Sequence, residues 1–182
     1  MNIMHTADLL RGMHKQKMSP NELTWIYCLS SCGTLGALGQ GKKIHSCIIE
    51  CAYDSNTGAG NALINTYSKC VASMEAFAVF NDIRQDVVSW NVMISGYVQH
   101  EHFHEALTCF QLMQAEGLFP DSITFICILK CSSNLGSIDI GEQIHHSIST
   151  MGLLEKDNIV LGTAVVDMYA KCGMLAKAQE LL

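Results

Sequence analysis

The chain matches itself at fixed offsets, and this internal repetition constrains its fold more than any other feature. An offset of thirty residues relates six pairs of identical residues: Asn61 and Asn91, Ile64 and Ile94, Tyr67 and Tyr97, Glu75 and Glu105, Ala76 and Ala106, and Phe80 and Phe110. An offset of one hundred relates nine more pairs, which run from Thr24 and Thr124 to Ile48 and Ile148. Segments of 30 to 37 residues therefore recur in a higher-order cycle of three. Self-similarity at such a period is the signature of a repeat array.

One repeat, residues 87–121, has the pattern of two short amphipathic helices. Its first helix places four residues on one face at the spacing i, i+3, i+4, i+7: Trp90, Met93, Ile94 and Tyr97. Gly96 and the polar run 99–102 then loosen the chain. The second helix repeats the spacing at Ala106, Cys109, Phe110 and Met113. Gly117 suits a left-handed helix stop, and Pro120 prevents continuation. Each helix buries only one stripe, so the repeat needs copies of itself on both sides.

Three sequence variants alternate, and together they resemble the P, L and S motifs of plant-type pentatricopeptide repeat proteins of the PLS subfamily. The P form is SWNVMISGYVQ followed by EALTCFQLMQAEGLFPD, the L forms are TLGALGQGKKIHSCIIE and NLGSIDIGEQIHHSIST, and the S forms are GNALINTYSKC and GTAVVDMYAKCG. The related tetratricopeptide signature W-x₂-L-G-x₂-Y is not seen in the sequence. The resemblance implies an all-α fold, a right-handed α-solenoid of stacked helix–turn–helix repeats.

The repeat boundaries predict one continuous array over residues 1–182. It comprises a partial P repeat (1–21), an L repeat (22–56), an S repeat (57–86), a P repeat (87–121), an L repeat (122–158) lengthened near Glu155, and a partial S repeat (159–182). In the first L repeat we expect helices from about Glu22 to Cys32 and from about Leu38 to Cys51. Both ends cut through a repeat, so the chain is predicted to be either a fragment of a longer array or a naturally eroded copy of one.

The family resemblance implies that the array binds single-stranded RNA and reads one base per repeat. The reading positions are the fifth and the last residue of a repeat. They are Asn61 and Asp86 in the complete S repeat, and Asn91 and Asp121 in the P repeat. An asparagine amide offers both a donor and an acceptor to a base. In the family, asparagine followed by aspartate resembles a reader of uracil, with cytosine second. Adjacent uridines are therefore the expected target of these two repeats.

The remaining repeats are expected to read less. Thr163, at the fifth place of the last S repeat, resembles purine readers. Ile26 and Ile126 hold that place in the L repeats and have no hydrogen-bonding group. Val88, in the second place of the P repeat, is a candidate to stack between adjacent bases. The alternative is that the asparagines and aspartates only cap helices, which is a usual role for both residue types.

The charge of the chain argues against RNA, because the formal net charge is −6 and the pI is near 5.7, whereas nucleic-acid binders usually carry a basic footprint. An acidic chain could still bind if lysine and arginine line the concave face. The alternatives are a scaffold that binds protein on the same surface, and a degenerate repeat fragment that binds nothing.

The family resemblance also implies a cellular setting. Family members act in mitochondria or chloroplasts, and no transit peptide is visible, since the first thirteen residues align with the second helix of a P repeat. Arrays of this kind often end in extension and deaminase-like domains that edit cytidine to uridine. The chain carries no deaminase signature, P-loop or nucleophile elbow, so no catalytic residue is assigned. Catalysis, and protein partners in an editing complex, are expected to be supplied elsewhere.

Nine cysteines raise the question of a metal site. Zinc sites prefer CxxC knuckles with a second pair at a fixed distance, and that spacing is missing here. We expect thiols packed in a reducing compartment, with no metal and no cofactor. His45 and His145 are expected to pack or to cap a helix. His100, His102 and His104 suit a solvated inter-helix turn, with weak binding of stray metal as the alternative. No apolar run approaches the roughly 20 residues that span a bilayer, so no membrane partner is predicted.

Overall fold

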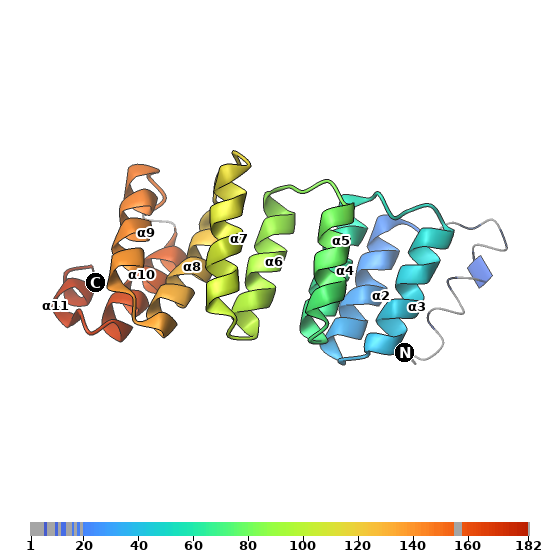
Figure 1. Cartoon of the computed structure of the whole chain (residues 1–182), viewed down its shortest axis with the longest axis horizontal. Coiled ribbons are helices and arrows are strands. Elements are labelled where there is room, and N and C mark those ends of the chain that lie inside the picture. The colour runs from blue at the N-terminus through green and yellow to red at the C-terminus, as the bar shows by residue number, and fades with distance from the viewer. Residues whose placement is uncertain are drawn as a thin grey trace. The chain divides into compact units, whose positions relative to one another are not determined.

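A computed structural model describes residues 21–154 and 158–181, together with seven earlier positions: Thr6, Leu10, Gly12, Met13, Gln16, Met18 and Pro20. Helices and connecting turns account for this described part, which contains no strand (Figure 1). The first helices of successive repeats are α2 (Glu22–Thr34), α4 (Thr57–Lys69), α6 (Val87–Gln99), α8 (Ser122–Leu135) and α10 (Ile159–Lys171). The second helices are α3 (Leu38–Glu50), α5 (Ser73–Asp82), α7 (Phe103–Ala115), α9 (Ile138–Thr150) and α11 (Leu175–Glu180).

The chain divides into an N-terminal unit, Met1–Gly96, and a C-terminal unit, Tyr97–Leu182. In the N-terminal unit α2 packs beside α4, α3 contacts both of these helices, and α5 packs against α4. In the C-terminal unit α8 packs beside α10 in the same manner, with α7 against α8, α9 against both, and α11 against α10. Within each unit, first helices therefore pack side by side and second helices cover them, as expected for stacked hairpins.

The predicted bounds of the two helices in residues 22–56 are confirmed to within two residues, at Glu22–Thr34 and Leu38–Glu50. The predicted stop at Gly117 is also confirmed, because its φ of 76° is left-handed. The predicted partial repeat at 1–21 lies largely outside the described residues, and so does Glu155 in the lengthened L repeat.

The predicted apolar faces of the P repeat are mostly buried. Trp90, Met93 and Ile94 are at most 4% exposed, and Tyr97 is half-buried while its neighbour Val98 is buried. In α7 the buried residues are Ala106, Phe110 and Met113, with Cys109 half-buried. The buried residues of both helices therefore follow the predicted spacing, as expected when each helix buries one face.

The sequence prediction for Gly96 was wrong in one respect. Gly96 does not loosen the chain, because α6 continues through it to Gln99. A Cβ atom at Gly96 would lie 2.6 Å from Oγ of Ser68, which belongs to α4. Gly96 therefore permits the close approach of α6 to Ser68 of α4. This contact joins residues far apart in the chain, so the local sequence could not predict it.

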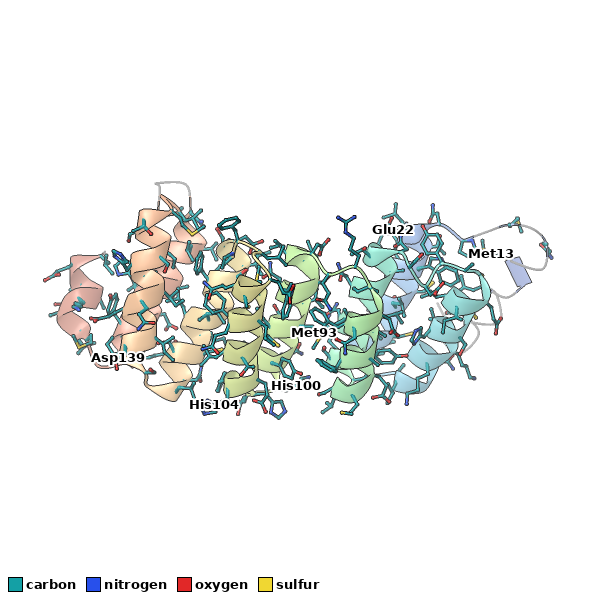
Figure 2. The ribbon with its side chains drawn as sticks, turned by 45° about the horizontal axis from the view of Figure 1, so that its top comes forward. Met13, Glu22, Met93, His100, His104 and Asp139 are labelled. Carbon is teal, nitrogen blue, oxygen red and sulfur yellow. The ribbon has the colours of Figure 1, made fainter. Side chains whose placement is uncertain are left out.

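A second correction concerns the histidine cluster. His100 and His102 do precede the second helix, but α7 begins at Phe103, so His104 is helical (Figure 2). Nδ1 of His102 lies 3.8 Å from Oε1 of Glu105 at an exposed position. Throughout the described ranges, no group of three or more histidine, cysteine, aspartate or glutamate side chains is placed to hold a metal ion.

The cysteines are buried or half-buried. All nine lie in the described part of the chain and remain thiols outside any disulfide. Burial raises the pKa of Cys131 to about 12 and that of Cys109 to about 11. Such thiols are poor nucleophiles and poor metal ligands, because the thiolate is the reactive form. Among the same residues, none of the helices combines the length and the apolar character that crossing a bilayer requires.

Candidate nucleic-acid interface

Three consecutive first helices of the N-terminal unit line a hollow of about 320 Å³. Each helix contributes residues one turn apart along its length. The lining comprises Ile26 and Ser30 from α2, Gly58, Asn61, Ala62 and Asn65 from α4, and Val88 and Val92 from α6. Residues three and four apart lie on one face of a helix. The three first helices therefore present one facing stripe each to the same space.

Asn61 is the predicted base reader that lies in this hollow. Its Oδ1 atom is buried, and no hydrogen-bond donor in the described part of the chain reaches it. A buried acceptor left without a donor costs about 1–3 kcal/mol. Ile26, which sequence reasoning assigned no hydrogen-bonding role, forms part of the apolar wall beside it. An incoming group with an N–H donor would satisfy Asn61 in a largely apolar setting.

Asn91, the second predicted reader, has a different environment from Asn61. It is only 5% exposed and does not line the hollow, although Val88, three residues earlier on α6, does. Both asparagines are predicted readers, because each holds the fifth place of its repeat. The structure instead distinguishes an open position at Asn61 from a buried one at Asn91.

The predicted closing residue Asp86 is an N-cap. Its Oδ1 accepts hydrogen bonds from the backbone N–H of Ser89 at 2.8 Å and from the Ser89 hydroxyl at 3.0 Å. The Ser89 hydroxyl in turn accepts from the backbone N–H of Asp86 at 3.3 Å. Reciprocal bonds of this kind satisfy N–H groups that the helix leaves unpaired.

Asp121, the other predicted closing residue, caps α8 in the same way. Its Oδ1 accepts from the backbone N–H of Thr124 at 3.0 Å and from the Thr124 hydroxyl at 3.1 Å. The capping alternative from the sequence therefore holds for both aspartates. A carboxylate has about four lone-pair sites, so a cap on one oxygen is compatible with a further contact.

Asparagine performs the same capping at the other repeat junctions. Asn21, Asn56 and Asn158 each accept from a backbone N–H three residues later, at 2.9, 2.8 and 3.4 Å. The last residue of a repeat thus caps the next first helix at all five described junctions. The repeat boundaries in the sequence contain this signal, because each of the five positions is Asn or Asp.

A row of exposed aliphatic side chains was missed by sequence reasoning, which singled out only Val88. Val88 is 54% exposed, and three further repeats carry an exposed aliphatic residue at the same second place: Leu23 at 59%, Ile123 at 56% and Val160 at 68%. The S repeat at 57–86 is the exception, because Gly58 holds the place. Counting from each repeat boundary would have found the row.

Thr163, the predicted purine reader, lies on α10 in the C-terminal unit and is exposed. Its hydroxyl donates a hydrogen bond to the backbone carbonyl of Ile159 at 2.7 Å. The hydroxyl proton is therefore engaged within the helix, and what Thr163 offers outward is acceptor capacity.

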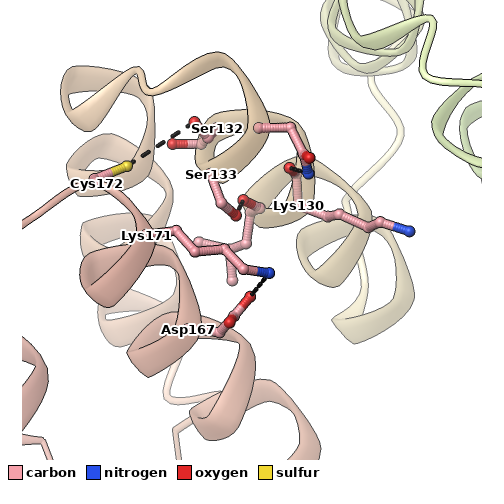
Figure 3. Close-up of polar contacts among 8 residues, drawn as sticks. Lys130, Ser132, Ser133, Asp167, Lys171 and Cys172 are labelled. Carbon is pink, nitrogen blue, oxygen red and sulfur yellow. Dashed lines mark hydrogen bonds and ion pairs between the residues drawn. The ribbon is translucent and has the colours of Figure 1, made fainter.

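Charge is distributed unequally between the two kinds of helix. The first helices carry three lysines and two acidic residues: Lys69, Lys130 and Lys171, with Glu22 and Asp167. The second helices carry three lysines and seven acidic residues. Lys171 pairs with Asp167 at 2.7 Å near the end of α10, while Lys130 is exposed on α8 (Figure 3). The acidity of the chain therefore resides outside its first helices.

Side-by-side first helices, covered by second helices and capped at each repeat boundary, define a helical repeat protein of the α-solenoid class. The PPR repeat family matches residues 85–134, and the PPR repeat matches residues 163–182. The chain belongs to the pentatricopeptide repeat family.

Relatives match along nearly the whole chain. A pentatricopeptide repeat-containing protein of Arabidopsis thaliana is 41% identical over 176 residues, which cover 96% of this chain and 31% of that protein. A chloroplastic pentatricopeptide repeat-containing protein of the same plant is 37% identical over 171 residues, covering 93% of this chain and 27% of that one. The chain thus spans less than a third of the length of either relative.

A solved structure has the same fold. The pentatricopeptide repeat protein PPR10, in complex with an 18-nt psaJ RNA element, superposes with a TM-score of 0.69 at 19% identity. The match covers 99% of this chain and 26% of that one. The predicted all-α solenoid fold is confirmed.

Proposed function

We propose that the chain contributes to the binding of single-stranded RNA by one-base-per-repeat recognition. The observation that carries this proposal is the hollow around Asn61, where a buried Oδ1 faces an apolar space between three first helices. A base edge has the N–H donor that this acceptor needs, and its ring faces suit apolar walls. The solved complex of PPR10 with RNA supports RNA as the ligand.

The reading pairs are Asn61 with Asp86 and Asn91 with Asp121. They belong to consecutive repeats, so the expected target is two adjacent pyrimidines, with uridine preferred. Val88 lies between the two reading asparagines along the array, and its exposed side chain can contact the face of a base. The L repeats present isoleucine at the reading place and tolerate any base.

Phosphate contacts come from the first helices in this proposal. Lys69, Lys130 and Lys171 all belong to that helix class, whereas the excess of acidic residues belongs to the other. Binding should therefore weaken steeply with salt, because each neutralised phosphate releases counterions. A protein-interaction scaffold would lack this steep dependence.

The relatives support a cellular role in organelles. Those most similar in sequence include proteins named mitochondrial and chloroplastic. We assign the chain to organellar RNA processing such as cytidine-to-uridine editing, with catalysis supplied by other domains or partner proteins.

The test is a binding selection with the purified chain and a pool of randomised single-stranded RNA at low and moderate salt. Enrichment of adjacent pyrimidines, and its loss in Asn61→Ala, would support the proposal. In Asn91→Thr the preference at the second position should move from pyrimidine towards guanine, with the first position unchanged. A flat profile for the native chain would refute it.

A further inference from the structure

The carboxylate of Glu22 occupies the place where a side chain on Gly58, one of the residues that line the hollow, would begin. Glu22 is the first residue of α2 (Figure 2), and Gly58 lies in the first turn of α4. A Cβ atom built on Gly58 would overlap Oε1 of Glu22 and lie 2.8 Å from its Cδ. Any side chain at position 58 would have to displace the acid. The carboxylate therefore lies over Gly58, which holds the second place in the one repeat that has no aliphatic residue there.

Glu22 lies on the same face of α2 as Ile26 and Ser30, which line the hollow. On α2, Glu22, Ile26 and Ser30 follow each other at intervals of four, so they share one face. On α4, Gly58 and Asn61 are three residues apart and share the facing stripe. The carboxylate over Gly58 therefore stands one helical turn from the reading amide of Asn61.

The second L–S junction contains the complementary exchange. Ser122 replaces Glu22 at the start of α8, and Val160 replaces Gly58 on α10. The Ser122 hydroxyl accepts a hydrogen bond from Nδ2 of Asn158 at 2.9 Å, and Val160 is 68% exposed. The first junction thus combines the long acidic side chain of Glu22 with Gly58. The second combines the short hydroxyl side chain of Ser122 with Val160.

We infer that Glu22 is a specificity-determining residue that raises the share of cytosine relative to uracil at the base read by Asn61. This inference rests on the proposed function and deepens it. An ionised carboxylate only accepts hydrogen bonds. Cytosine carries an exocyclic amino group that can donate to it, whereas uracil presents the O4 acceptor at that place, and acidic side chains recognise cytosine through this amino group.

The adjacent repeat is a built-in comparison. At the base read by Asn91, the places of Glu22 and Gly58 are held by Thr57 and Val88. No acidic side chain stands at these two places, so the choice there rests on Asn91 and Asp121. The two adjacent pyrimidine positions should therefore differ, with more cytosine at the first than at the second.

The test is the RNA selection with three versions of the full chain: native, Glu22→Gln and Glu50→Gln. Glu50→Gln removes the same charge from α3, a second helix of the same repeat. We expect the cytosine-to-uracil ratio at the first position to fall about threefold or more in Glu22→Gln, in line with loss of one base contact. The second position in Glu22→Gln, and both positions in Glu50→Gln, should keep their ratios.

A double variant, Glu22→Ser with Gly58→Val, copies the second junction and should move the first position towards uracil as well. Thermal unfolding of each version shows whether it is folded. If pyrimidines are enriched but the ratio is the same in native and Glu22→Gln, Glu22 does not set the base and the proposed function stands. If no version enriches any base, the proposed function fails and this inference with it.

Discussion

Nδ1 of His45 lies 2.9 Å from the hydroxyl of Tyr67, and the same relationship recurs between His145 and Tyr169, also at 2.9 Å. Each pair joins the second helix of an L repeat to the first helix of the following S repeat. The rings of each pair pack edge to face, with interplanar angles of 61° and 79°. The predicted packing role of both histidines is confirmed, and the L–S junction has a defined polar contact.

Removing one hydroxyl from this contact should destabilise the fold. Tyr67→Phe leaves the half-buried Nδ1 of His45 without its partner, so we expect a loss of about 0.5–1.5 kcal/mol in the free energy of unfolding. Tyr169→Phe should cost a similar amount, and the double variant the sum, because the pairs belong to separate units. Urea unfolding gives the free energy of unfolding of each variant. The control is Tyr27→Phe, since Tyr27 is 69% exposed and should tolerate the change.

The same histidines predict a dependence on pH. Burial lowers the pKa of His45 and of His145 below the ordinary value, and Lys177 lowers that of His145 further. The unfolded chain therefore binds these protons more readily, so stability rises with pH. It is full above about pH 6.5, the unfolded pKa, and is lost as the pH falls through the lower folded values.

Urea midpoints measured between about pH 7.5 and about pH 5.5 should fall on the acid side. A variant with both His45→Gln and His145→Gln should show a smaller fall. An unchanged fall in that variant would assign the pH dependence to other groups.

Much of this architecture could be predicted from the sequence, because the matched offsets and the apolar spacing both reflect the same helical hairpin. Matched offsets located the repeats, apolar spacing located Trp90 and Met93 in the core, and Gly117 marked a helix end. Contacts between helices could not be predicted in this way. The approach of Gly96 to Ser68, the carboxylate of Glu22 over Gly58, and the differing burial of Asn61 and Asn91 depend on residues far apart in the chain.

The closing aspartates allow capping and reading to be separated. Asp86→Ala removes the acceptor for the first turn of α6 and should cost about 0.5–2 kcal/mol of stability. Asp86→Asn should change stability much less, since Asn21 and Asn56 cap α2 and α4 in this chain. If Asp86 also contacts the base, both variants should alter the RNA preference at the first position. A profile altered only in the destabilised variant would identify Asp86 as a cap alone.

The two asparagines should respond oppositely in stability and in binding. Oδ1 of Asn61 is buried, with no donor near it among the described residues. Asn61→Ala should therefore leave the free energy of unfolding within about 0.5 kcal/mol, or raise it, since an unsatisfied polar group is removed. The preference for a pyrimidine at the first position should disappear.

Asn91 is 5% exposed, so Asn91→Ala should cost about 1–3 kcal/mol, as expected when a buried polar side chain is lost. Urea unfolding and the RNA selection give the two readouts. Equal destabilisation by both substitutions would mean that Asn61 stabilises the fold and is not an acceptor left available to a base.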